Sequence, residues 1–226
     1  MNLFHFATVA LILLCNPVNA LEVYLVRHGE TDWNAEDRLQ GQADIPLNAH
    51  GIDQCQQLAE KLAYIQFDAC YASDLSRAYD TASILTADYN LTVVPDSRLR
   101  ELDCGIFEGR YIDDELREAF TRALLSESED HSDGVERLNA FCVRVDEVMD
   151  ELLEAHSEDE RIMIVCHGGV ARMMLERLDF EIEGEKVIRL PNANYLCMTV
   201  DDEGERVITH IDGWDSPSIV GGGFSW

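Results

Sequence analysis

Residues 22–34 read EVYLVRHGETDWN, and the character of this stretch changes abruptly near its middle. Its first part, EVYLV, is short, mostly apolar and β-branched, which predicts a buried strand at 22–26. Arg27 and His28 follow directly after it. Because binding sites in parallel α/β sheets lie at the carboxyl ends of the strands, this junction is where we expect chemistry.

Two other apolar runs end in the same way. DACYA at 68–72 precedes a polar segment that contains Arg77, and RIMIVC at 161–166 is followed directly by His167. If the three strands are parallel neighbours, their carboxyl ends meet at one edge of the sheet. Together with the residues after the first strand, two arginines and two histidines are then predicted to converge there.

The two later strand ends also begin helices. Arg77 lies in the first turn of one predicted helix, and His167 precedes the Gly168-Gly169 pair that opens another. A helix N-terminus offers free N–H groups and the positive end of a dipole, and arginine offers a planar fork that suits a phosphoryl group. Each residue alone has a more ordinary interpretation, as a structural histidine or a surface arginine. Their coincidence at three strand ends predicts a phosphate site built without metal.

The rest of the chain alternates predicted helices and strands, with no internal repeat and no long linker. Helical spacing marks 48–62, 74–85, 113–125, 138–152 and 168–178, with Asn48 and Asp74 as N-caps. Strands are expected at 91–95, 195–200 and 206–211, and the acidic stretch 126–134 reads as a solvated loop. This alternation predicts an α/β three-layer sandwich with a mostly parallel central sheet flanked by helices.

Length and charge restrict the possible classes of protein. The chain has 226 residues, enough for one sizeable core and too few for two full-size domains. Its 17 Lys+Arg against 44 Asp+Glu give a formal net charge of −27. A charge of this sign disfavours nucleic acid and anionic membrane surfaces as partners. Because only two of the basic residues are lysines, we hypothesise a surface suited to high salt.

Residues 1–20 carry no Asp, Glu, Lys or Arg. The apolar stretch Phe6–Cys15 is too short to span a bilayer, which takes about 20 residues, and it suits the apolar region of a signal peptide. Val18 and Ala20 provide the small residues of a cleavage site. We therefore expect residues 1–20 to be a signal peptide and the protein to be exported, without stable membrane association after cleavage. An extra N-terminal helix or a mis-assigned start codon remains the alternative, and the protein is then cytoplasmic.

Seven cysteines are spread along the chain without a C-x-x-C pair or a zinc-finger spacing. Cys55 and Cys142 lie on apolar helix faces and Cys166 ends an apolar strand. Buried free thiols are expected for most of them, and the sequence assigns no disulfide pairs.

Four motifs occur along the chain in this order: RHGETDWN, SDLSRAYDTA, LRELDCGIFEG and VCHGG. They resemble the signature motifs of the histidine phosphatase superfamily, in its phosphoglycerate mutase-like branch, and the resemblance spans roughly residues 22–200. It implies the phosphoglycerate mutase-like fold for 21–226 as one domain. It also implies an enzyme that acts on a small phosphate ester and needs neither metal nor cofactor. The oligomeric state is left open.

The resemblance also assigns roles. His28 becomes the nucleophile that forms phosphohistidine, and Glu101 the general acid and then base. The phosphoryl group is expected to contact Arg27, Asn34, Arg77, His167 and the backbone N–H of Gly168. On chemical grounds, nearby arginines should lower the pKa of His28, and the carbonyl of Gly29 could fix its tautomer.

Other carboxylates compete with this assignment. Asp103 is a second candidate for the general acid. Glu30 and Asp32 could bind a metal ion with the two histidines, but the neighbouring arginines would repel a cation.

The same resemblance bears on the reaction. Glu101 and His167 are 66 residues apart, the segment after Glu101 lacks lysine, and Cys104 stands where the mutases have tyrosine. These departures favour hydrolysis of a phosphomonoester. Mutase-type phosphoryl transfer, a protein-phosphatase role and a non-catalytic phosphate-binding module remain alternatives. Glu136, with Arg144, resembles a further phosphatase element, and we interpret it as shaping the substrate cap.

Overall fold

The computed structural model describes residues 20–128, 130–177, 181–182, 185–186 and 190–212. Residues 1–19 lie outside these ranges. They include Cys15 and all of the expected signal peptide except Ala20. No helix within the described part of the chain is long and apolar enough to span a membrane.

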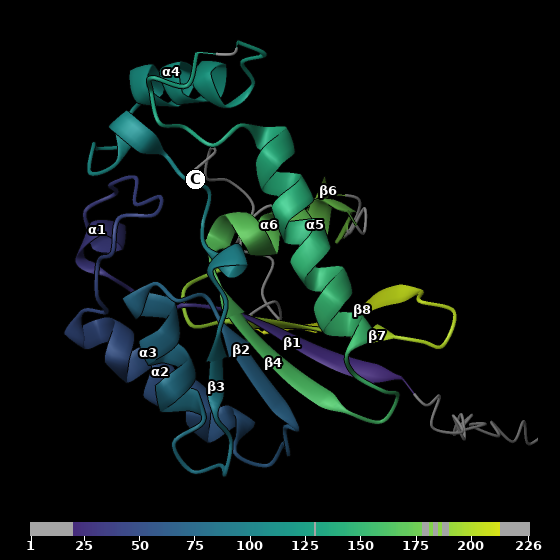
Figure 1. Ribbon diagram of the computed structural model, residues 1–226. Coiled ribbons are helices and arrows are strands. Elements are labelled where there is room, and N and C mark those ends of the chain that lie inside the picture. Colours follow the sequence, from purple (N-terminus) through teal and green to yellow (C-terminus); the bar gives the residue numbers. More distant parts are fainter. Residues whose placement is uncertain (1–19, 129, 178–180, 183–184, 187–189, 213–226) are drawn as a thin grey trace, which may run out of the picture.

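A six-stranded mixed sheet forms the centre of the molecule, in the order β3-β2-β4-β1-β7-β8 (Figure 1). Its strands are β1 Leu21–Arg27, β2 Ala69–Ala72, β3 Val93–Pro95, β4 Arg161–Cys166, β7 Tyr195–Val200 and β8 Arg206–Ile211. The first four are parallel to one another, while β7 and β8 are antiparallel to their neighbours. The expected mostly parallel sheet is confirmed, with β1, β4 and β2 adjacent. A small two-stranded sheet, β5 Glu181–Ile182 with β6 Glu185–Lys186, was not expected.

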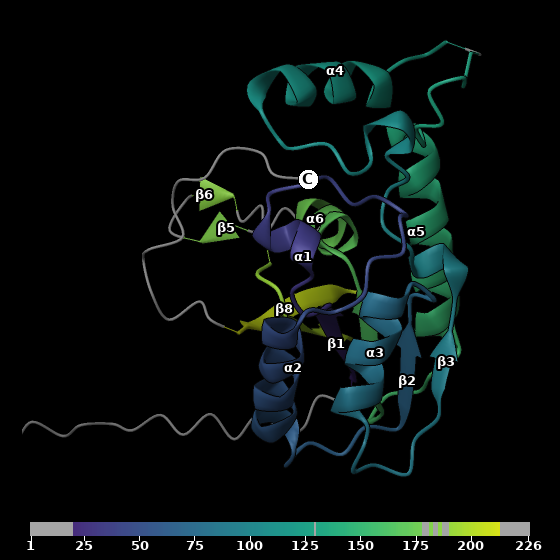
Figure 2. The same cartoon turned by 90° about the vertical axis from the view of Figure 1, so that its left-hand side faces the viewer.

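Helices cover both faces of this sheet, as Figures 1 and 2 show. They are α1 Asp32–Ala35, α2 Ala49–Leu62, α3 Ser76–Leu85, α4 Asp114–Leu124, α5 Leu138–Glu154 and α6 Gly168–Arg177, with 3-10 turns η1 Ser97–Leu99 and η2 Gly105–Phe107. Helices α2 and α3 pack on one face, and α5 and α6 on the other. Helix α4 lies beyond the carboxyl ends of the parallel strands (Figure 1). The three-layer sandwich is confirmed.

Strand β4 shows why its sequence is a continuous apolar run. Ile162 and Ile164 belong to the core under α5 and α6, whereas Met163 and Val165 belong to the core under α2 and α3. All four side chains are fully buried (0% exposed). A strand covered on both faces needs apolar residues at every position instead of alternate ones.

Two helices begin with the caps that their sequences favour. The side chain of Asn48 accepts a hydrogen bond from the N–H of Gly51 at 2.7 Å, as expected. Asp113 does the same for Leu116 at the start of α4. Such caps satisfy N–H groups that have no partner within the helix.

The expected cap of α3 is wrong. Leu75 occupies the N-cap position, without a side-chain hydrogen bond. Asp74 instead binds Arg100 through both carboxylate oxygens, at 2.7 and 2.6 Å, and Asp44 accepts from the N–H of Ser76. A two-pronged, charge-assisted pair is stronger than a bond to one backbone N–H, so the arginine takes the carboxylate.

The cysteines that the structure describes are free thiols, as expected. Five are buried, namely Cys55, Cys70, Cys104, Cys166 and Cys197, and Cys142 is half-buried. Burial raises the pKa of Cys70 to about 12, which keeps it protonated and unreactive at neutral pH.

Candidate active site

The residues predicted to form the site come together at the carboxyl ends of β1, β2 and β4. One cavity with a volume of about 50 Å³ is lined by Arg27, His28, Asn34, Arg77, Glu101 and Gly168, among others. His167 is buried behind it, with its ring centroid 5.2 Å from that of His28. The sequence therefore predicted correctly which residues gather.

His28 directly follows β1 and is nearly fully buried. Its Nδ1 lies 2.6 Å from the carbonyl oxygen of Gly29. Since a carbonyl can only accept, Nδ1 carries the hydrogen, and Nε2 keeps its lone pair in the neutral ring. Burial, followed by the charges of Arg77 and Arg27, holds the pKa of His28 well below its usual value. The ring is therefore neutral at neutral pH and has a lone pair on Nε2.

His167 directly precedes α6 and is fully buried. Neither of its ring nitrogens has a hydrogen-bond partner among the described residues. Burial, and then the charges of Arg77, His28 and other neighbours, lowers its pKa well below the usual value. Buried polar atoms nearly always have partners, so two orphaned nitrogens beside His28 indicate a place that a ligand completes.

Arg77 brings a buried positive charge to the same place. Its side chain is 0% exposed, and it donates to the carbonyls of Ala43 at 2.8 Å and Gly41 at 2.7 Å. No carboxylate of the described residues lies within ion-pairing distance of it, and its Nε has no hydrogen-bond partner among them. The carboxylates of Glu101, Asp44 and Glu108 act on Arg77 without forming an ion pair, and a buried cation that lacks a directly paired carboxylate favours an anion beside it.

Arg27 is oriented by a contact with a different part of the chain. Its Nη1 donates to the carbonyl of Leu190 at 2.8 Å, and its side chain is 8% exposed. A Cβ added at Gly168 would lie 3.4 Å from the Arg27 guanidinium carbon, so the start of α6 and this arginine are in contact distance. The positive end of the helix dipole and the guanidinium therefore act on the same point.

Glu101 lies in the irregular chain between η1 and η2. Its Oε2 accepts from the N–H of Gly169 at 2.9 Å, and its Oε1 from that of Leu102 at 3.0 Å. The carboxylate is thus held at the N-terminus of α6 and lines the cavity. Asp103, the competing acid, instead accepts from the N–H of Gly105 and does not line the cavity.

Asn34 is positioned by a residue that the sequence did not reveal. Its Oδ1 accepts from the N–H of Thr31 and from the side-chain amide of Asn192, at 3.2 Å each. The amide of Asn192 also lies 3.0 Å from the carbonyl of His28. Because Oδ1 is occupied, the amide N–H groups of Asn34 are the donors available to a phosphoryl oxygen.

The carboxylates considered for a metal site are placed elsewhere. Glu30 accepts from the side-chain amide of Asn48 at 3.0 Å, and Asp32 is exposed in α1. Neither lines the cavity. Within the described residues, no group of three or more His, Cys, Asp or Glu side chains is arranged to hold a metal ion.

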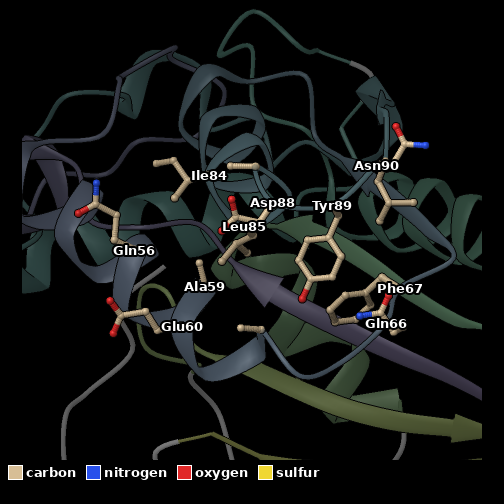
Figure 3. A pocket seen from close by; sticks show the side chains of 13 residues that line it. Gln56, Ala59, Glu60, Gln66, Phe67, Ile84, Leu85, Asp88, Tyr89 and Asn90 are labelled. Atoms are coloured by element: carbon tan, nitrogen blue, oxygen red, sulfur yellow. The ribbon is translucent and has the colours of Figure 1, made fainter.

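A second, larger hollow of about 740 Å³ lies at the far ends of α2 and α3 from this site (Figure 3). Its aromatic side chains serve packing, since Tyr89 donates to the carbonyl of Leu62 and its ring meets that of Phe67 edge-on. None of the predicted site residues lines it. Despite its size, it offers no counterpart to the arginine and histidine cluster.

Comparison with known proteins gives the same family. The model of the histidine phosphatase superfamily (branch 1) matches residues 23–213. The probable phosphoglycerate mutase GpmB of Enterobacter sp. (strain 638) is 36% identical over 207 residues, which cover 89% of each chain.

Solved structures agree in fold. Phosphoglycerate mutase from Bacillus anthracis superposes with a TM-score of 0.73 at 27% identity, covering 84% of this chain and 92% of that one. The alpha-ribazole phosphatase from Shigella flexneri reaches 0.71 at 28% identity, covering 84% and 95%. With its fold, its four motifs and these relatives in agreement, the chain belongs to the histidine phosphatase superfamily.

Proposed function

We propose that the protein hydrolyses small phosphate monoesters through a phosphohistidine formed on His28. The observation that carries this proposal is the pairing of two buried, neutral histidines with the buried cation of Arg77. One histidine has a free lone pair, and the other has two unsatisfied ring nitrogens. A phosphoryl group supplies the charge and the oxygen atoms that this cluster lacks.

In the first step, Nε2 of His28 attacks phosphorus and the bond to the leaving oxygen breaks. Glu101 gives its proton to that oxygen, so the leaving group departs as a neutral alcohol. Arg27, Arg77 and His167 stabilise the charge on the three oxygens that transfer, which is the main demand of phosphoryl transfer.

In the second step, a water molecule attacks the phosphohistidine. Glu101, now a carboxylate, takes one proton from that water, and the P–N bond breaks. Inorganic phosphate leaves, and the lone pair returns to His28. Glu101 can act first as an acid and then as a base, because a proton leaves it in the first step and returns to it in the second.

The size of the cavity supports a phosphoryl pocket. A buried water needs roughly 10–15 Å³ of such volume, so about 50 Å³ holds only a few heavy atoms. A phosphoryl group fits this volume, and we expect the rest of a substrate to extend toward the mouth.

Mutase-type transfer to a sugar acid is the second candidate, because relatives bear the name phosphoglycerate mutase. A mutase must hold a second acceptor over the phosphohistidine. The segment after Glu101 contributes no lysine to do so, and Cys104 in it is buried. We therefore favour hydrolysis.

One set of assays tests these alternatives. The protein, treated with EDTA, is given a panel of phosphomonoesters across pH while phosphate release is measured, and 3-phosphoglycerate mutase activity is measured in parallel. Hydrolysis well above any mutase turnover is the expected result. Equal or greater mutase activity would favour transfer.

Trapping of the intermediate separates an enzyme from a binding module. A base-stable, acid-labile phosphoenzyme should form with labelled substrate and disappear in His28→Ala. Appreciable metal-independent turnover by His28→Ala would overturn the mechanism. Glu101→Gln should slow esters with poor leaving groups most, within the 10²–10⁴-fold range of general acid catalysis.

We also propose that residues 1–20 are removed on export, leaving 21–226 as the mature domain. Strand β1 begins at Leu21, so cleavage after Ala20 leaves the sheet complete. N-terminal sequencing of the protein from its own cells should yield Leu21. An intact Met1 in the cell interior would contradict export.

A further inference from the structure

Glu136 and Arg144 form an ion pair beside the active site. The Nε and Nη2 atoms of Arg144 donate to Oε1 and Oε2 of Glu136 at 2.9 and 2.7 Å. Both side chains are largely buried, at 20% and 16% exposed. Both carboxylate oxygens of Glu136 are thus engaged by an arginine of α5, while the expectation that Glu136 shapes a substrate cap stays a prediction.

The same guanidinium donates hydrogen bonds to the backbone segment that carries Glu101. Its Nη1 donates to the carbonyls of Arg98 at 2.6 Å and Arg100 at 2.9 Å, and its Nη2 reaches that of Glu101 at 3.4 Å. Arg144 thus joins three carbonyls of residues 98–101 to helix α5.

Glu136 holds the far side of Glu101. Its Oε2 accepts from the N–H of Asp103 at 3.3 Å, and its own N–H donates to the carbonyl of Asp103 at 3.0 Å. The segment that carries Glu101 is therefore fixed before and after this residue by the two members of one ion pair.

Side chains from elsewhere also contact this segment: Arg100 pairs with Asp74, and the side-chain amide of Gln42 donates to the carbonyl of Glu101 at 3.2 Å. Residues 100–103 lie between η1 and the bridge residue Cys104 and have no regular structure. The carboxylate of Glu101 is itself held by two backbone N–H groups, so its position follows that of the main chain. Displacement of a catalytic group by about 1 Å can cost on the order of 10²-fold in rate.

We propose that Arg144, locked by Glu136, is a positioning residue that sets the general acid Glu101 in place; this inference rests on the function proposed above. Arg144 acts through the backbone and not by contact with the substrate. Its loss should therefore slow phosphoenzyme formation most for esters whose leaving oxygen needs a proton, and least for esters whose leaving group departs without one.

The experiment compares kcat/KM for phosphate esters whose leaving groups range from dinitrophenol to an alkyl alcohol, because kcat/KM reports formation of the phosphoenzyme and not its later hydrolysis, in which Glu101 acts as the base. Arg144→Met should lose on the order of 10–100-fold with alkyl phosphate and little with dinitrophenyl phosphate, which needs no proton. Arg144→Lys keeps the charge without the fork, so it should fall between Arg144→Met and the wild type.

Arg137→Met is the matched control. Arg137 is also mostly buried, pairs with Asp133 and binds the carbonyls of Val135 and Asp130, all outside the segment that carries Glu101. Arg137→Met should lower the free energy of unfolding about as much as Arg144→Met does. It should leave the dependence of the rate on the leaving group as it is in the wild type. Glu136→Gln, a smaller change, serves where Arg144→Met does not fold, and should show the same selective loss.

A double-variant comparison completes the test. Arg144→Met should cost nothing further in a Glu101→Gln background. A loss that is uniform across leaving groups, or additive with Glu101→Gln, would overturn the positioning role while leaving the phosphatase mechanism intact. Absence of a phosphoenzyme on wild-type His28 would instead overturn the proposed function, and this inference with it.

Discussion

The backbone N–H of Gly169 donates a hydrogen bond to Oε2 of Glu101, with an N···O distance of 2.9 Å. The bond joins the proposed general acid to the first turn of α6, the helix that His167 precedes. A Cβ added at Gly169 would overlap Oε1 of Glu101. Glycine is therefore required here by the closeness of a side chain that must stay in place.

We expect Gly169→Ala to reduce activity far more than stability. The carboxylate can swing away from the new methyl group, so the fold accommodates it, and alanine in a helix gains about 0.5–1 kcal/mol over glycine. Loss of the placed acid should slow alkyl phosphates on the order of 10²-fold. Steady-state kinetics and urea denaturation of the same sample measure both effects. Because the methyl acts only through the carboxylate, an equal loss in a Glu101→Ala background would contradict this account.

Thr81 links the turn after His28, the proposed nucleophile, to the helix that carries Arg77. Its hydroxyl accepts from the N–H of Gly29 at 3.1 Å and donates to the carbonyl of Arg77 at 2.7 Å. The side chain is fully buried. Thr81→Val keeps the shape, leaves the N–H of Gly29 unpaired and should cost about 1–3 kcal/mol of unfolding free energy. The rate of phosphoenzyme formation should fall on the order of tenfold, because His28 is fixed through the same turn.

Two variants separate positioning from general destabilisation. Thr81→Ser retains the hydroxyl and should recover most of the rate. Thr86→Val removes another buried hydroxyl at the end of α3, one that donates to Ala82 and does not touch the nucleophile turn. It should leave phosphoenzyme formation unchanged. Equal kinetic losses in Thr81→Val and Thr86→Val would remove the specific role of Thr81.

The depressed pKa values of His28 and His167 predict how stability depends on pH. Both rings stay neutral in the folded protein at pH values where they take up a proton once unfolded, near pH 6.5 and below. The unfolded state then binds more protons, so the unfolding free energy falls as pH falls, by up to about 1.4 kcal/mol per pH unit for each histidine. Their full contribution is present above pH 6.5 and is lost toward the folded pKa.

Replacement of one histidine should remove its share of this slope. Between pH 6.5 and 5.5, the wild type should lose about 1 kcal/mol more than His28→Gln. Urea denaturation at the two pH values measures the difference, and His167→Gln should behave in the same way. Parallel pH dependences of wild type and both variants would show that the histidines are not held neutral.

The central sheet and the gathering of the site were predictable because long apolar strands and the residues that end them are local features. Strand β4, covered on both faces, is apolar throughout, and His167 follows it directly. The parallel order then requires neighbouring strand ends to meet. Sequence-local patterns and one topological rule brought Arg27, Arg77 and His167 together, on the further assumption that the three strands are parallel neighbours, which the sheet order confirms.

The errors and omissions arose where tertiary contacts decide. Asp74 has the residue type of a cap, but Arg100, distant in sequence, takes its carboxylate. Asn192 lies in a loop far along the chain, and its proximity to His28 follows only from the pairing of β1 with β7. Arg144 was visible as part of a motif, whereas the carbonyls that it binds cannot be identified without the fold.

The net charge of −27 raises a question for the proposed phosphatase activity, because a phosphate ester is an anion. The field of the whole protein should repel a phosphate ester until it reaches the buried arginines. Salt shortens that field, from roughly 10 Å at 0.1 M to roughly 3 Å at 1 M. We therefore expect kcat/KM for a small phosphate ester to rise with added NaCl from low to moderate concentration. By contrast, kcat should change little, because the bound ester is already inside the cavity. Stopped-flow or initial-rate measurements across the salt series check this, and a flat or falling kcat/KM would mean that the arginines at the site already outweigh the acidic surface.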